Sequence, residues 1–220
     1  MFEINKIYLL NTNQIDYDYW YSLMPNDRKL KIDKCIYLKD KLLSLGAGIL
    51  LYNGLKELNI DYNITYNEYN KPYLDNIYFN ISHSNNLVVC VFSDSEIGVD
   101  IEKIKPFDNI INNIFTTNEI NYIKNNNQDN NLLYTKLWTI KESLLKYLGL
   151  GITINPKSIN IDLSNESIKY NYLNKEVYFK TFIIDDYVLT ICSEYKDFNE
   201  ELEWFKTVYY ENQAEFIGLE

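Results

Sequence analysis

Two long helical patterns, each accompanied by a run of short strands, limit the possible folds of this chain most strongly. The first covers residues 26–58, where leucines and isoleucines recur at helical spacing and a break is expected near Cys35. The second covers residues 132–148 and ends at Gly149, a residue suited to a helix C-terminus. Strands and helices do not alternate one by one, so a parallel βαβ sheet is excluded and an α+β fold is predicted.

Short strands are expected in both halves of the chain. They cover residues 2–10, 64–66, 77–81, 87–92, 97–101, 159–163, 168–172, 177–184 and 188–193. Lys105-Pro106 reads as a linker, because proline ends strand pairing. We therefore expect two similar α/β subdomains with pseudo-twofold symmetry, residues 1–104 and 105–210, and an active-site cleft between them. An acidic tail would follow at 211–220.

Local signals mark three further elements. A short helix is expected over residues 14–23, and Asn85-Asn86 should turn the chain between two strands. Thr116 is a good N-cap for a helix through Ile123, and Glu119 three residues later completes a capping box.

Composition and charge exclude several classes of protein. A net charge of −10 over 220 residues argues against nucleic-acid binding, which needs a basic face. No signal peptide is visible, and no run approaches the roughly 18 apolar residues of a membrane span. The three cysteines are far apart and lack metal-ligand spacing, which indicates buried thiols in a reducing compartment. We therefore expect a soluble cytoplasmic protein.

Two strand blocks carry side chains suited to phosphate chemistry. Residues 79–84 hold His83, the single histidine, between two serines. Residues 98–103 place Asp100 and Glu102 two positions apart, so both carboxylates point to one face of a strand. A cation would relieve their repulsion, and hard oxygen ligands favour Mg²⁺ or Mn²⁺ over zinc. Each block alone also fits an ordinary strand end or a solvated strand face.

A third block lies on the helix expected over 132–148. Glu142 and Lys146 share one helix face, close to Trp138. Alone, this is an ordinary helix with a Glu–Lys pair. Together, in this order, the three blocks indicate a divalent cation and a phosphate-bearing substrate.

In their order and spacing these blocks resemble the 4′-phosphopantetheinyl transferases of the surfactin-synthetase-activating type. The resemblance runs from about Pro25 to about Thr153 and includes Lys71-Pro72 and Phe115-Thr116. It implies a monomeric two-subdomain enzyme that transfers the phosphopantetheine arm of coenzyme A to a serine of an acyl or peptidyl carrier protein. The released product would be adenosine 3′,5′-bisphosphate.

The resemblance also implies three groups of site residues. The carboxylates that would bind Mg²⁺ are Asp100, Glu102 and Glu142. The catalytic residues would be Glu142, Lys146 and His83. Coenzyme A would be held by Lys71, Pro72, Ser82, His83, Lys146 and Arg28.

Within these groups the resemblance implies finer roles. Glu142 would take the serine proton, Lys71 and Pro72 would lie beside the adenine, and Ser82 would lie near the 3′-phosphate. The chain departs from the family pattern at Asp27 and Leu30, where relatives carry basic residues that hold the 3′-phosphate. Arg28 or Lys31 would take their place after a small helix rotation.

The resemblance also implies carrier docking at the helix over 116–124 and the adjoining Lys136 and Lys141 side, and Phe115, Ile120 and Ile123 are expected to supply an apolar contact there. Two other functions stay open at this point. A metal-dependent phosphodiesterase or nucleotidyl hydrolase would use the same carboxylates to activate water. A carrier-binding module without activity would keep the fold alone.

Overall fold

The structure, a computed structural model, describes residues 5–69, 71–107, 111–170 and 176–207. The N-terminal half begins with β1 (Asn5–Asn11), a short 3₁₀ turn (Thr12–Gln14) and α1 (Tyr17–Leu23). The expected break near Cys35 is confirmed: the chain forms α2 (Asn26–Asp33) and then α3 (Leu38–Glu57). Tyr37 between them is extended, with φ −89° and ψ 142°, so the second helix starts afresh at Leu38.

Four strands form the N-terminal sheet in the order β11-β1-β5-β4. The pairs β1–β5 and β5–β4 are antiparallel, whereas β11 pairs with β1 in parallel. The expected Asn85-Asn86 turn joins β4 to β5, and Asn85 adopts the left-handed conformation with φ 54°. The strands are β4 (Tyr78–Ser84), β5 (Leu87–Ser93) and β11 (Glu203–Trp204), and a separate small ribbon pairs β2 (Thr65–Tyr66) with β3 (Pro72–Tyr73).

Five antiparallel strands form the C-terminal sheet in the order β6-β10-β9-β8-β7. They are β6 (Ile97–Lys103), β7 (Ile159–Asp162), β8 (Ser167–Tyr170), β9 (Val177–Ile184) and β10 (Tyr187–Ser193). Two short 3₁₀ turns, Gly151–Thr153 and Pro156–Ser158, lead into this sheet.

The helices of the C-terminal half are α4 (Ile111–Ile114), α5 (Thr117–Lys124) and α6 (Asn130–Leu148). The expected capping box is present, since Thr116 caps α5 and the Glu119 side chain binds back to the Thr116 amide. The expected helix end is confirmed too: Gly149 is left-handed, with φ 65°, and its amide binds the Leu145 carbonyl.

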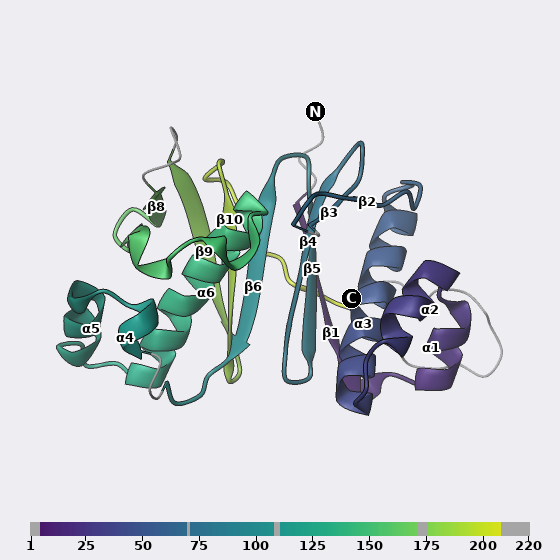
Figure 1. Cartoon of the computed structure of the whole chain (residues 1–220), viewed down its shortest axis with the longest axis horizontal. Helices are drawn as coiled ribbons and strands as arrows, with labels where there is room; N and C mark the ends of the chain where they lie inside the picture. The colour runs from purple at the N-terminus through teal and green to yellow at the C-terminus, as the bar shows by residue number, and fades with distance from the viewer. Residues whose placement is uncertain (1–4, 70, 108–110, 171–175, 208–220) are drawn as a thin grey trace.

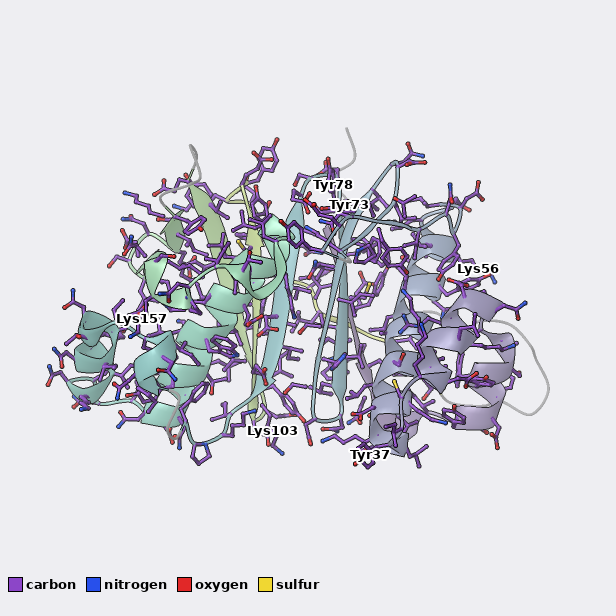
Figure 2. All side chains as sticks on the ribbon, viewed as in Figure 1. Tyr37, Lys56, Tyr73, Tyr78, Lys103 and Lys157 are labelled. Carbon is purple, nitrogen blue, oxygen red and sulfur yellow. The ribbon has the colours of Figure 1, made fainter. Side chains whose placement is uncertain are left out.

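Helices cover the outer faces of two sheets that pack against each other through their inner faces (Figure 1). Helix α3 packs on the N-terminal sheet and α6 on the C-terminal sheet. Apolar side chains from β1, β5, β6 and β10 fill the space between the sheets, as the sticks in Figure 2 show. The α+β prediction is therefore confirmed.

Gly98 allows α6 to approach β6 unusually closely. A Cβ atom at this position would lie 2.0 Å from the Ser143 carbonyl oxygen and 2.5 Å from the Tyr147 amide nitrogen. Any side chain there would push the helix away from the strand. The glycine thereby places the α6 residues near 142–146 directly over β6.

Strands β4 and β6 are edge strands of the two sheets, and they meet through side chains instead of a backbone ladder. Three β4 side chains, spaced two residues apart, accept hydrogen bonds from alternate amides of β6. The bonds run from Val99 to Asn80 Oδ1 (3.2 Å), from Ile101 to Ser82 Oγ (3.3 Å) and from Lys103 to Ser84 Oγ (3.1 Å). The exposed amides of an edge strand are thus satisfied at this junction.

The expected boundary at residue 104 stays a prediction. Strand β6 precedes that boundary but pairs with β10 of the C-terminal sheet, and β11 near the C-terminus pairs with β1. The expected acidic tail, 211–220, lies outside the described residues. In the part of the chain that is described, no helix is both long and apolar enough to cross a lipid bilayer.

Candidate active site

A cavity of about 890 Å³ opens between α2 and α3 on one side and β4 and α6 on the other. This volume suits a ligand of nucleotide size. Six of the predicted site residues line it: Arg28, Lys71, Pro72, His83, Glu142 and Lys146. The other three, Ser82, Asp100 and Glu102, lie behind this wall on β4 and β6.

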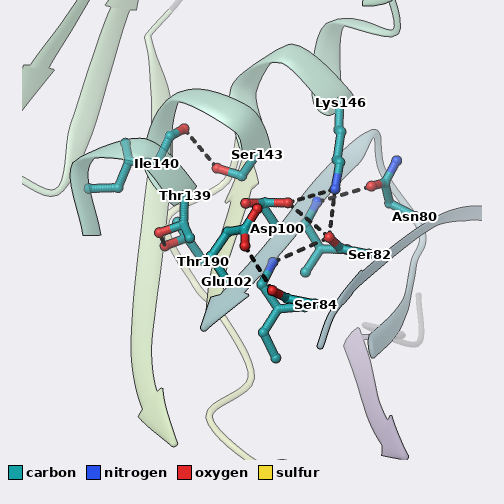
Figure 3. A network of polar contacts seen from close by, with 12 residues as sticks. Asn80, Ser82, Ser84, Asp100, Glu102, Thr139, Ile140, Ser143, Lys146 and Thr190 are labelled. Carbon is teal, nitrogen blue, oxygen red and sulfur yellow. Dashed lines mark hydrogen bonds and ion pairs between the residues drawn. The ribbon is translucent and has the colours of Figure 1, made fainter. Parts of the chain in front are cut away.

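Lys146, Asp100 and Ser82 form the centre of a polar network (Figure 3). The Lys146 Nζ atom lies 2.7 Å from Asp100 Oδ1 and 2.7 Å from Ser82 Oγ. The Ser82 hydroxyl donates to the same Asp100 oxygen at 2.8 Å. Asp100 is 4% exposed, and its Oδ2 atom is buried without a hydrogen-bond partner in the described structure. One carboxylate oxygen is therefore left to accept a further partner.

Glu102 lies two residues farther along the same strand face, beside Ser84. The Ser84 hydroxyl donates to Glu102 Oε2 at 2.8 Å. Desolvation raises the pKa of the Glu102 carboxyl, and the hydrogen bond from Ser84 opposes this shift. The strand places both carboxylates on the face toward α6, as the spacing predicts.

Glu142 projects from α6 into the cavity. Desolvation, followed by the nearby Asp100 carboxylate, raises the pKa of Glu142 to about 7, while Lys146 opposes this shift. Three carboxyl groups thus influence one another beside the Lys146 ammonium, and Lys105 also acts on Glu102. A group with a pKa near neutrality can take up and release protons under ordinary conditions.

These carboxylates do not form a closed metal cage. Within the described residues, no group of three or more His, Cys, Asp or Glu side chains is arranged so that it could hold a metal ion. The Lys146 ammonium lies on Asp100 Oδ1, where a cation would otherwise sit. The donor set itself, with buried carboxylate oxygens and the unpartnered Asp100 Oδ2, matches the preference of a hard divalent cation.

His83 lines the cavity wall, where neighbouring groups surround part of its ring. It alternates along β4 with Ser82 and Ser84, so the strand sends its hydroxyls toward β6 and its imidazole into the cavity. Desolvation lowers the pKa of His83, and the Lys146 ammonium lowers it further.

Lys71 is already occupied by protein partners. Its ammonium pairs with Glu96 and donates to the Tyr147 carbonyl at 2.9 Å, and it lies 5.5 Å from the centre of the Tyr73 ring (labelled in Figure 2). Burial lowers the pKa of Lys71. The side chain therefore ties the segment before Pro72 to the end of α6, and its predicted place beside an adenine stays a prediction.

Arg28 is the basic residue of α2 that lines the cavity. It donates to the carbonyl oxygen of Ser44 and lies 3.3 Å from the Ser44 hydroxyl, and its Nε atom is buried without a partner in the described structure. Lys31, the other residue considered for this place, contacts Tyr66 and does not line the cavity. Lys34, at the end of the Arg28–Lys34 region considered for the 3′-phosphate, lines it as well.

The apolar carrier contact expected at α5 is wrong in two of its three residues. Phe115 is 1% exposed and Ile123 0% exposed, because both pack into a small core beneath α5. Ile120 is partly buried against the same core, and Lys141, expected on the docking side, is 0% exposed. The apolar face of α5 packs against this core and is therefore not available to a partner. The sequence periodicity shows that the face is apolar but not that it is covered.

Comparison with known proteins identifies the family. A family model described as "4′-phosphopantetheinyl transferase superfamily" matches residues 96–192, from β6 to β10. The 4′-phosphopantetheinyl transferase gsp of Aneurinibacillus migulanus is 32% identical over 203 residues, which are 86% of this chain and 86% of that protein. The 4′-phosphopantetheinyl transferase ffp of Bacillus subtilis is 29% identical over 86% of this chain and 91% of its own length. The chain therefore belongs to the 4′-phosphopantetheinyl transferase superfamily of enzymes.

Proposed function

We propose that the protein transfers the 4′-phosphopantetheine arm of coenzyme A to a serine of an acyl or peptidyl carrier protein and releases adenosine 3′,5′-bisphosphate. We further propose that it requires Mg²⁺, with Mn²⁺ as a substitute, and works in the cytoplasm as a monomer. The observation that supports this best is the nucleotide-sized cavity whose wall adjoins three carboxylates and one shared lysine.

The cavity wall provides groups for both ends of coenzyme A. Arg28 and Lys34 are cationic groups at the α2 end, where the 3′-phosphate would bind. His83 and Lys146 lie at the opposite wall, where the pyrophosphate would bind. Ser82 is buried on Asp100 and Lys146, so it would act on the phosphates through these two residues.

Asp100, Glu102 and Glu142 would hold the divalent cation. When bound, the cation supplies charge neutralisation for the pyrophosphate. Before coenzyme A binds, Lys146 neutralises part of the carboxylate charge by pairing with Asp100. On arrival of coenzyme A, the Lys146 ammonium is free to exchange this carboxylate for a phosphate oxygen, because 29% of its side chain remains accessible.

Glu142 would accept the proton of the carrier serine. The serine oxygen forms a bond to the phosphorus that carries the pantetheine arm, and the bond from that phosphorus to the bridging oxygen breaks. The bridging oxygen leaves with adenosine 3′,5′-bisphosphate, and Lys146 spreads the charge that develops there. In the metal-free protein the pKa of Glu142 is about 7, and a bound cation would lower it, so the carboxyl would be ionised and able to accept the serine proton near neutral pH.

The test is incubation with coenzyme A, Mg²⁺ and purified carrier proteins, followed by mass spectrometry of each carrier. The proposal expects the carrier to gain the mass of the phosphopantetheine arm. Omission of the carrier separates the hydrolase, because cleavage of coenzyme A without an acceptor would show that water is the acceptor. Binding of a carrier with neither transfer nor cleavage would favour the inactive binding module.

A further inference from the structure

One contact occurs twice between β4 and β6, two residues apart (Figure 3). In the first copy, Ser82 Oγ accepts the Ile101 amide at 3.3 Å and donates to the Asp100 carboxylate at 2.8 Å. In the second copy, Ser84 Oγ accepts the Lys103 amide at 3.1 Å and donates to Glu102 at 2.8 Å. Each serine hydroxyl thus forms one hydrogen bond with a carboxylate and one with the backbone amide of the next residue.

The repeat follows from strand geometry. Alternate residues of β4 share one face, so both hydroxyls point to the free edge of β6. The other edge of β6 is held by β10, where Asp100 lies opposite Thr190 and Glu102 opposite Val188. The β6 backbone therefore has hydrogen-bond partners on both edges. The side-chain torsion angles of Asp100 and Glu102 are not determined by these backbone contacts.

The two serines differ in what else they contact. Ser82 also receives a hydrogen bond from Lys146 at 2.7 Å, so its hydroxyl joins a shared charge network. For Ser84 the hydrogen bonds are those with the Lys103 amide and Glu102. A change at Ser84 therefore reports on Glu102 more selectively than a change at Ser82 would.

We propose that Ser84 is a positioning residue that aims the Glu102 carboxylate at the cation of the active site. This inference rests on the proposed function, in which Glu102 is a metal ligand. Glutamate has three rotatable side-chain bonds, and a donor fixed on Oε2 limits the orientations that the Glu102 carboxylate can adopt. Hydrogen-bond partners of metal ligands commonly change metal affinity by about 10-fold to 100-fold when they are removed.

The test compares Ser84→Ala with Ser84→Thr, which restores a hydroxyl at the same carbon. The matched control is Ser95→Ala, whose hydroxyl binds Ser93 near the other end of β6. The measurements are the Mg²⁺ concentration for half-maximal transfer and the Mn²⁺ dissociation constant from electron paramagnetic resonance with coenzyme A present. We expect Ser84→Ala to raise both by about 10-fold or more, and kcat at saturating Mg²⁺ to stay within about threefold of wild type.

Ser84→Thr should restore both values to within about threefold, and Ser95→Ala should leave them unchanged. In a Glu102→Gln background, Ser84→Ala should have little further effect on Mn²⁺ binding, because the two residues act as one unit. If Ser84→Ala does not fold, Ser84→Cys takes its place, since a thiol fills the space but donates only weakly.

Unchanged metal dependence in folded Ser84→Ala or Ser84→Cys would overturn the inference. Equal effects in the wild-type and Glu102→Gln backgrounds would overturn it too, because the serine would then act independently of Glu102. The proposed function fails separately, if the wild-type protein modifies none of the carrier proteins. The two failures are therefore distinguishable.

Discussion

Helix α6 carries three lysines, and the surroundings of two of them, Lys141 and Lys146, differ sharply. Lys141 is fully buried; its ammonium lies 2.9 Å from Glu119 Oε1 and donates to the Pro156 carbonyl at 2.8 Å. The remaining oxygen of Glu119 binds the Thr116 amide. Lys146 instead pairs with Asp100 and also acts on the neighbouring Glu142 and Glu102.

The difference separates a structural ion pair from a functional cluster. In the first region each charge has a partner, because Glu119 and Lys141 match one to one and carbonyl oxygens complete the ammonium. In the second region three carboxyl groups lie close together without one-to-one partners, and the Asp100 Oδ2 atom is unsatisfied in the described structure. Clustered carboxyl groups with an unsatisfied oxygen lower the stability of the folded protein. They are typical of a site in which a bound ligand supplies the missing partners.

Removal of one of the carboxylates beside Lys146 should reduce transfer more than any other change. Asp100→Ala or Glu142→Ala should reduce transfer by at least about 1000-fold, equivalent to about 4 kcal/mol in the activation barrier. The fold should persist, because fewer like charges meet at the site. Steady-state transfer assays and circular dichroism measure the two effects. Asp61→Ala, at an exposed position, makes the same charge change as a control. Near-normal turnover of Asp100→Ala at limiting Mg²⁺ would show that the metal site is wrongly assigned.

Breaking the balanced pair should act on stability. Lys141→Met leaves the Glu119 carboxylate and two carbonyl oxygens without their partner, which typically costs about 3–5 kcal/mol for a buried pair. Chemical denaturation measures this loss. The double variant Lys141→Met/Glu119→Gln should recover part of it, because glutamine keeps the capping box but carries no charge. A loss below about 1 kcal/mol in the single variant would contradict the structural role.

The raised pKa of Glu142 predicts a pH-dependent stability in metal-free protein. Between the ordinary carboxyl pKa of 4.5 and the folded value of about 7, the folded state binds more protons than the unfolded state. Glu142 therefore favours folding below this window, and its contribution declines as the pH rises through it. Glu142→Gln should increase the free energy of unfolding at pH 8 by about 1–3 kcal/mol and lose this advantage near pH 5.

Denaturation of both proteins with a chelator present, at pH 5 and pH 8, measures this difference. Mg²⁺ at pH 8 should stabilise the wild-type protein more than Glu142→Gln, since the cation neutralises only the ionised carboxylate. An equal stability of the two proteins at pH 8 would show that burial and the neighbouring carboxylates do not raise the pKa of Glu142.

The smallest effect is expected at the cap of α5. Thr116→Ala removes the hydroxyl that accepts the Glu119 amide, and N-cap losses typically cost about 1 kcal/mol. Thermal denaturation measures this cost, and transfer by the folded protein should be unchanged. A marked fall in transfer at full folding would mean that α5 contributes to carrier use as well as to stability.

Much of the fold could be predicted from short-range patterns. The Thr116–Glu119 capping box, the Gly149 helix end and the Asn85-Asn86 turn involve residues at most a few positions apart, so local chemistry decides them. The break near Cys35 could be predicted for the same reason. The orientation of Asp100 and Glu102 to one face follows from the period of a strand.

Contacts between distant segments could not be predicted in this way. The family resemblance places Ser82 near a phosphate, but its hydroxyl donates a hydrogen bond to Asp100, 18 residues away in sequence. The Lys141–Glu119 pair joins two helices, and the burial of Phe115 and Ile123 depends on which face of α5 meets α6. A sequence pattern shows that a face is apolar but not what covers it.

Patterns within the sequence were sufficient to predict most helices and strands, the order of the three blocks and, by resemblance, the family. The pairing of the charges followed from the packing of the folded chain: Lys141 with Glu119, Lys71 with Glu96, and Lys146 with Asp100. The physical reason is that secondary structure depends on neighbours within a few residues, whereas the energy of a buried charge depends on every group packed around it. For Asp100, Ser82 and Lys146, these groups come together where β4 and β6, from two different sheets, meet edge to edge beneath α6.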